Sequence, residues 1–183
     1  RLSLSFGIPE VRRHEAGLHM DVYRESKSDG LQLEFVLQNM DDDGVNNIGY
    51  EQPVVEAFER GSGKSPFDLS NGDPDWLQFR ADYLTTFIKE LRDALRAESQ
   101  DARLTSTIVA REPEGYMNVF QDWRAWLDQG LLDEFYLWFR TTSDLRELER
   151  QTKHAAEAVN GRVPLVVELS CFHPGSFQRP DAL

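Results

Sequence analysis

Two glutamates stand on short strand-like segments that lie far apart in the sequence. Glu34 belongs to the pattern at 31–36, and Glu168 belongs to the pattern at 165–170. Two further strand-like runs lie between them, each flanked by helix-like sequence, so the glutamates are expected three strands apart. In an eight-stranded α/β barrel, strands three apart face each other across the mouth, where the chemistry is built. Two facing carboxylates are the minimum equipment for cleaving a glycosidic bond.

The same two glutamates also fit a structural role, as interior polar residues of a barrel paired with Arg or Lys. The distance between the carboxyl groups distinguishes the two hypotheses. A retaining glycosidase holds its pair about 5 to 5.5 Å apart, and an inverting one about 6.5 to 9.5 Å apart. A separation far outside these ranges would favour the alternative, a non-catalytic carbohydrate-binding or scaffold barrel.

Aromatic and polar side chains at the expected strand ends are candidates for substrate binding. Trp138, Tyr116 and Phe172 fall at or after strand ends, where a flat ring can stack on a sugar or line a pocket. Arg140 and His173 also follow strands and would stand at the same rim. Structural alternatives remain open for three of them: barrel packing for Trp138, an ion pair for Arg140 and a capped loop position for His173.

The charge and composition exclude several classes of partner. The 20 Lys and Arg are outnumbered by 32 Asp and Glu, giving a net charge of −12, so no nucleic-acid partner is expected. No run approaches the roughly 18 apolar residues of a membrane span, so no membrane partner is expected either. Cys171 is the only cysteine, which excludes an intrachain disulfide and a cysteine zinc cluster. The compartment stays open.

No cofactor or metal is expected. The acidic run at 41–43 invites a calcium site, but it lacks the regular spacing and the distal glutamate of a calcium loop, so a solvated loop is favoured. No G-x-G-x-x-G or phosphate-binding loop follows any strand pattern. A nucleotide-dependent α/β enzyme therefore ranks last among the hypotheses.

Strand patterns alternate with helix patterns along the chain. The predicted strands are 31–36, 104–110, 132–138 and 165–170, and the predicted helices are 9–26, 53–60, 75–98, a short helix from 122 that ends at Gly130, and a segment from 144 to near 161. Parallel neighbours need such crossovers, so the fold class is α/β with a mainly parallel sheet. In the first strand Gln32 and Glu34 alternate with Leu31 and Leu33, which predicts a polar interior face and an apolar face toward the helices.

Several stretches resemble one family of proteins. The segments Gly30-Leu31-Gln32-Leu33-Glu34-Phe35, Gly49-Tyr50-Glu51-Gln52-Pro53, Asp75-Trp76-Leu77-Gln78-Phe79-Arg80 and Asp122-Trp123-Arg124-Ala125-Trp126-Leu127 occur in matching order and spacing. Together they resemble the bacterial glycosyl-hydrolase barrels described as family-10-like. The resemblance covers most of the chain from residue 9 to residue 172.

The resemblance implies a partial (β/α)8 TIM barrel, roughly strands four to seven with their helices, so that 1–183 is a single domain and a fragment of a larger barrel. It implies that Glu34 is the acid/base and Glu168 the nucleophile, acting on an unidentified carbohydrate. The first and last strands of such a fragment have unpaired edges, which favour self-association.

Overall fold

The computed structural model describes residues 5–34, 48–109, 119–139 and 144–169. In chain order the elements are α1 (Pro9–Ser26), β1 (Gly30–Leu33), α2 (Gln52–Ser62), the 3-10 helix η1 (Pro66–Asp68), α3 (Pro74–Glu98), β2 (Arg103–Ile108), α5 (Trp123–Asp128), β3 (Glu134–Phe139), α6 (Leu145–Val159) and β4 (Leu165–Leu169). The predicted alternation of strands and helices is confirmed, and η1 is an addition to it.

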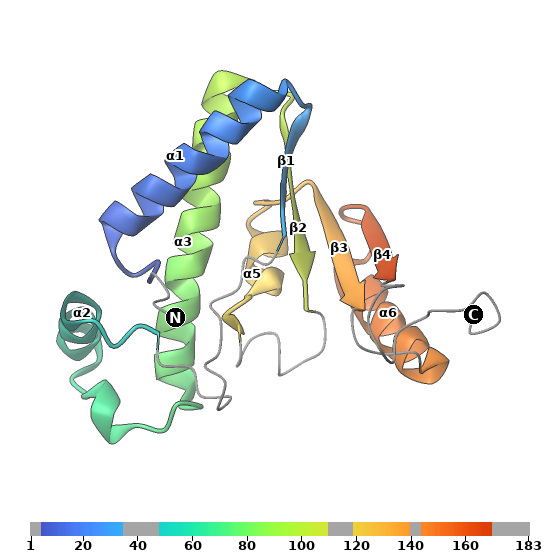
Figure 1. The fold of residues 1–183 in the computed structure, drawn as a ribbon. Helices are drawn as coiled ribbons and strands as arrows, with labels where there is room; N and C mark the ends of the chain where they lie inside the picture. The colour runs from blue at the N-terminus through green and yellow to red at the C-terminus, as the bar shows by residue number, and fades with distance from the viewer. Residues whose placement is uncertain (1–4, 35–47, 110–118, 140–143, 170–183) are drawn as a thin grey trace.

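The four strands form one parallel sheet in the order β1-β2-β3-β4 (Figure 1). This order follows the sequence without the reversal that creates the crevice of a doubly wound sheet. The α/β class is confirmed, and the sheet is compatible with part of a TIM-barrel-like fold.

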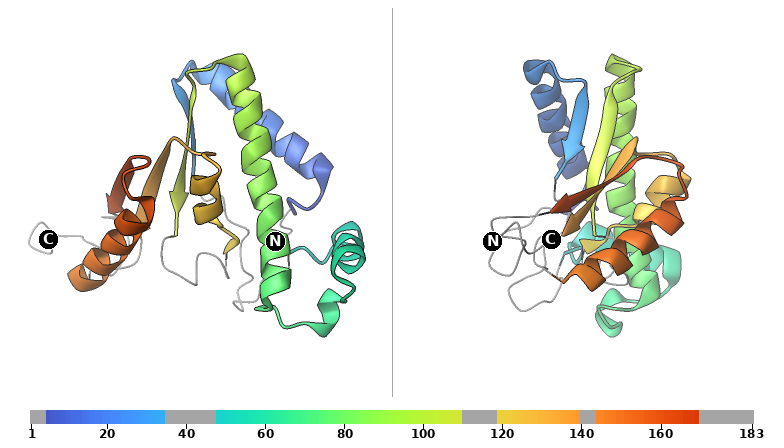
Figure 2. Two further views of the ribbon diagram at one scale, coloured as in Figure 1. Left: turned by 180° about the vertical axis from the view of Figure 1, so that it is seen from behind. Right: turned by 90° about the vertical axis from the view of Figure 1, so that its right-hand side faces the viewer.

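The helices α3, α5 and α6 lie on one side of the sheet (Figure 2, right). In β1, β2 and β3 the strand residues that face them include Leu33, which is 1% exposed, and Ile108 and Leu137, which are 0% exposed. On the opposite face Gln32 and Glu34 are exposed. The predicted alternation of apolar and polar faces in the first strand is therefore confirmed.

Helix α3 provides most of the apolar surface that covers the sheet. Asp73 caps its first turn by accepting hydrogen bonds from the backbone N–H groups of Asp75 and Trp76. Its buried side chains recur every three or four residues and join the strands in one core: Leu77, Ala81, Leu84, Phe87, Ile88, Leu91 and Leu95. Among the described residues, no helix combines the length and the apolar character needed to cross a membrane.

Strand β3 begins two residues later than the sequence predicts. Leu131 and Leu132 are buried, but they belong to the turn after α5, where the Leu131 N–H donates to the Trp126 carbonyl at 2.8 Å. Apolar residues such as Leu131 and Leu132 predict burial but not the element that buries them. Here a tight turn buries both residues before the hydrogen bonds of β3 begin.

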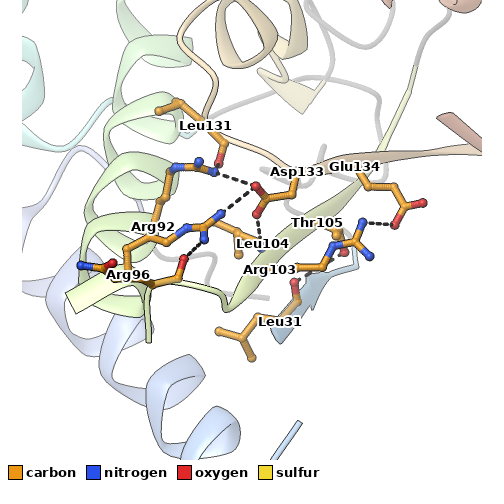
Figure 3. Close-up of polar contacts among 10 residues, drawn as sticks. Leu31, Arg92, Arg96, Arg103, Leu104, Thr105, Leu131, Asp133 and Glu134 are labelled. Atoms are coloured by element: carbon orange, nitrogen blue, oxygen red, sulfur yellow. Dashed lines mark hydrogen bonds and ion pairs between the residues drawn. The ribbon is translucent and has the colours of Figure 1, made fainter. Parts of the chain in front are cut away.

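Asp133 joins α3 to the amino ends of two strands (Figure 3). One carboxylate oxygen accepts from Arg96 at 2.8 Å and lies 3.7 Å from the Arg92 guanidinium, while the other accepts from the backbone N–H of Leu104 at 2.8 Å. Arg92 also donates to the Leu131 carbonyl at 2.7 Å. These bonds fix the amino end of the sheet, which in α/β barrels serves stability and not chemistry.

The connection between β1 and α3 carries α2 and η1, which lie toward the end of the molecule to which the strands point (Figure 1). Arg80 of α3 holds this connection in place and is 2% exposed. It donates to the carbonyls of Ile48 at 3.3 Å and Asn71 at 2.9 Å, and its guanidinium lies 4.8 Å from the Trp76 ring centre and 4.5 Å from that of Phe120. Burial lowers the pKa of Arg80 to about 10.

Candidate functional site

Glu34 and Glu168 lie on the same face of the sheet near its carboxyl end. Glu34 directly follows β1, whose last residue Leu33 pairs with Ser106. Glu168 is in β4 and pairs with Trp138 of β3. Two strands, β2 and β3, lie between β1 and β4, and this backbone spacing is not the distance between the two carboxyl groups. Both glutamates point to the face opposite the helices, so the expected three-strand spacing and shared face are present.

The environments of the two carboxyl groups differ. Glu34 is exposed, whereas Glu168 is half-buried and its Oε2 is shielded from solvent with no hydrogen-bond partner among the described residues. Burial raises the pKa of Glu168, and the negative charge of Glu34 raises this pKa further. The charge of Glu34 therefore acts on Glu168 across the intervening strands.

Trp138 is the substrate-binding candidate that the structure brings next to the pair. Its register places it beside Glu168 and on the same face. The side chain is half-buried and is not part of the hydrophobic core, in contrast to Trp123 and Trp126, which are 2% and 0% exposed. A position on the face that carries Glu34 and Glu168, the carboxylate face, is compatible with both roles considered for Trp138, contact with a ligand and barrel packing.

The sequence-based candidates Tyr116, Arg140, Phe172 and His173 lie outside the described residues, as does the acidic run at 41–43. Their predicted roles stay predictions. Within the described parts of the chain, no group of three or more His, Cys, Asp or Glu side chains is arranged to hold a metal ion.

Two residues between the glutamates were missed by the sequence analysis. Thr107 and Tyr136 pair with each other on the two middle strands and share the face of Glu34. The Thr107 hydroxyl donates to the Leu33 carbonyl at 3.1 Å and so fixes the backbone that presents Glu34. Both residues could have been identified from the sequence, because they are polar residues at alternating positions of otherwise apolar strands.

Gln121 fixes the carboxyl end of β2 on the same edge of the sheet. It is 1% exposed, its side-chain N–H donates to the Thr107 carbonyl at 3.2 Å, and its side-chain oxygen accepts from the Val109 N–H at 2.8 Å. The buried amide of Gln121 thus satisfies backbone groups at the end of β2 that lack a partner in a neighbouring strand. These bonds fix the end of β2 in the middle of the carboxylate face.

A four-stranded parallel sheet with crossover helices defines the chain as an α/β protein. The family model described as glycosyl hydrolase-like 10 matches residues 1–171. The chain belongs to this family, and the resemblance noted from the sequence is confirmed. A comparison with curated proteins gave no match.

Proposed function

We propose that this chain contributes the two carboxyl groups of a glycoside hydrolase-like site that cleaves glycosidic bonds of a carbohydrate. The observation that carries the proposal is the coupling of Glu34 and Glu168 on one face of the sheet, at its carboxyl end. In such a site one carboxyl group protonates the leaving oxygen as the bond to the anomeric carbon breaks. The other attacks that carbon or activates the water that does so.

The difference in burial bears on which glutamate carries the proton. An environment that desolvates a carboxyl group raises its pKa and suits a general acid. Glu168 has the raised pKa and the shielded oxygen, so we assign it the proton-donating role and Glu34 the role of the second carboxyl group. This is the reverse of the roles implied by the family resemblance.

The architecture we propose for the site is a segment of an eight-stranded barrel, roughly strands four to seven. The sequential parallel order and the one-sided helices support it. The lower burial of the helix-facing side of β4 also supports this architecture. Val167 faces the helix side and is 37% exposed, whereas its register partner Leu137 is 0% exposed.

We further propose that the edges of β1 and β4 associate with other strands, which analytical ultracentrifugation of the chain would detect as self-association.

Hydrolysis by the complete gene product, from initiator methionine to stop codon, tests the proposal. The substrates are aryl glycosides and a panel of oligosaccharides, with release of reducing sugar as the readout. Glu34→Gln and Glu168→Gln should each lower kcat/KM by about 10² to 10⁴-fold. The double variant should lose little more than either single one, because the two groups act as a unit.

Glu134→Gln is the matched control, since Glu134 lies on the same face but at the amino end of the sheet, where it accepts from Arg103 at 3.1 Å. It should keep wild-type turnover. If the wild type binds sugars without cleaving any of them, the alternative of a non-catalytic carbohydrate-binding barrel replaces the proposal.

Azide separates the two role assignments. When the acid/base is replaced by alanine in a retaining enzyme, azide attacks the glycosyl-enzyme and the product keeps the anomeric configuration of the substrate. When the nucleophile is replaced, azide attacks the substrate and the configuration inverts. Glu168→Ala is expected to give the retained product and Glu34→Ala the inverted one, as determined by proton NMR of the glycosyl azide.

A further inference from the structure

A cleft outside the carboxylate face opens between Tyr50, which precedes α2, the helix η1 and the segment that joins η1 to α3. It is lined by Tyr50, Pro66, Phe67, Leu69 and Asn71 and has a volume of about 380 Å³. All five residues belong to the connection that follows Glu34, and this connection lies at the end to which the strands point (Figure 1). Ligand sites of parallel α/β sheets are built by the connections at this end.

The cleft combines an exposed aromatic ring with an oriented amide. Phe67 is 68% exposed, and its ring centre lies 5.5 Å from that of Tyr50. The Tyr50 hydroxyl donates to Asn71 Oδ1 at 2.7 Å and accepts from Trp76 Nε1 at 3.1 Å. With Oδ1 engaged, the amide NH₂ of Asn71 is directed away from the tyrosine, and it has no hydrogen-bond partner among the described residues.

The walls of the cleft are fixed from behind. Arg80 donates to the Asn71 carbonyl at 2.9 Å, and the Trp76 ring lies edge-on to Tyr50 at 5.3 Å. The ammonium of Lys64, a charged group near this region, is paired with Asp75 at 2.6 Å. A rigid cleft lined by aromatic, aliphatic and amide groups, without a charged lining residue, suits a neutral ligand with an apolar face and a polar edge.

We propose that this cleft is a sugar-binding subsite that holds one ring of an oligosaccharide whose scissile bond lies at the glutamates. A pyranose ring presents C–H bonds on its face, which would cover Phe67, and hydroxyl groups at its edge, which would accept from the Asn71 amide. Exposure of a phenylalanine ring costs free energy in water unless a ligand covers it. The inference rests on the proposed function for the position of the scissile bond, but not for the binding of the sugar ring.

Binding is measured on the Glu34→Gln/Glu168→Gln variant of the complete gene product, so that no sugar is consumed. The probes are cellohexaose, xylohexaose, mannohexaose and maltohexaose, titrated by calorimetry. Phe67→Ala should weaken binding of the hexasaccharide that binds best by about five- to tenfold. Val22→Ala is the control, because Val22 is an exposed hydrophobic residue, 61% exposed, on the distant helix α1.

Kinetics separate this subsite from the glutamate site. With otherwise wild-type protein, Phe67→Ala should raise KM for the hexasaccharide and leave kcat/KM for an aryl monosaccharide within twofold. Equal hexasaccharide affinities for Phe67→Ala and Val22→Ala would overturn the subsite, as would failure of all four probes to bind. If the glutamate variants retain hydrolysis while Phe67→Ala still weakens binding, the proposed function fails and the subsite stands.

Discussion

Glu34 raises the pKa of Glu168, although two strands of the sheet lie between the elements that carry them. Burial is the larger cause of the shift and the charge of Glu34 the smaller one. A raised pKa suits the member of a carboxyl pair that donates a proton during catalysis. Because the effect of Glu34 appears in the pKa of Glu168, it can be measured without a substrate.

Glu34→Gln is expected to lower the pKa of Glu168, because it removes a negative charge that disfavours ionisation. The pKa should remain above the usual glutamate value, since the burial of Glu168 is unchanged. A carbon-13 NMR titration of the Glu168 carboxyl group measures both. Glu10→Gln is the control, because Glu10 is exposed and paired with Arg13 at 2.6 Å. An identical Glu168 titration in wild type and Glu34→Gln would contradict the coupling.

Glu168→Gln is expected to stabilise the fold at neutral pH. Because the folded-state pKa of Glu168 is raised, the folded protein binds more protons than the unfolded chain between the two pKa values, and stability falls as pH rises through that window. Glutamine carries no charge to desolvate, so the variant should melt about 1 to 3 °C higher at pH 7 and match the wild type below the unfolded value of about 4.3.

Thermal unfolding followed by circular dichroism at pH 3.5 and pH 7 measures the difference. Glu10→Gln should show no such pH-dependent gain. If Glu168→Gln melts lower than the wild type at pH 7, the carboxylate is stabilised in the fold and the burial argument is wrong.

The alternation of strands and helices could be predicted because it depends on local pattern. The helix α1 has the predicted limits, and the face alternation of β1 follows from a period of two residues. The late start of β3 could not be predicted, because Leu132 is as apolar as a strand residue and only the turn geometry excludes it from the ladder.

The candidate site was predictable in part for the same reason. Glu34 and Glu168 stand out as single acids in apolar strands, so their shared face follows from strand period and order. The cleft beside Phe67 was not predictable, because Tyr50 and Asn71 meet only through a tertiary contact. Arg80 could have been identified from the sequence, because it is a cation at a buried position of α3 between Trp76 and Leu84. The search for helix periodicity considered only the apolar residues and therefore missed it.

Two glycines give opposite predictions for the same substitution. A Cβ at Gly30 would lie 2.1 Å from the Arg103 carbonyl oxygen, so Gly30→Ala must push β1 away from β2 and should cost about 2 kcal/mol. A Cβ at Gly17, within helix α1, would meet nothing within 4 Å. Gly17→Ala should therefore add about 0.5 to 1 kcal/mol through helix propensity. Urea denaturation measures both, and equal effects would contradict the close approach at Gly30.

Asp133→Ala is expected to destabilise the protein by about 2 to 3 kcal/mol. It removes the charge-assisted bond to Arg96 and the ion pair with Arg92, and it leaves the backbone N–H of Leu104 without its acceptor. The Asp133 side chain is 22% exposed, so water replaces these bonds only in part. The loss should appear in urea denaturation as a lower midpoint with an unchanged slope.

Asp128→Ala provides the matched control for that substitution. Asp128 also binds an arginine, Arg162, at 2.6 Å, but its side chain is 69% exposed, and exposed ion pairs contribute about 0 to 1 kcal/mol. The two variants therefore differ in burial and in the backbone contact, and not in the kind of ion pair removed. If Asp128→Ala and Asp133→Ala lower the free energy of unfolding equally, Asp133 does not hold α3 to the amino end of the sheet.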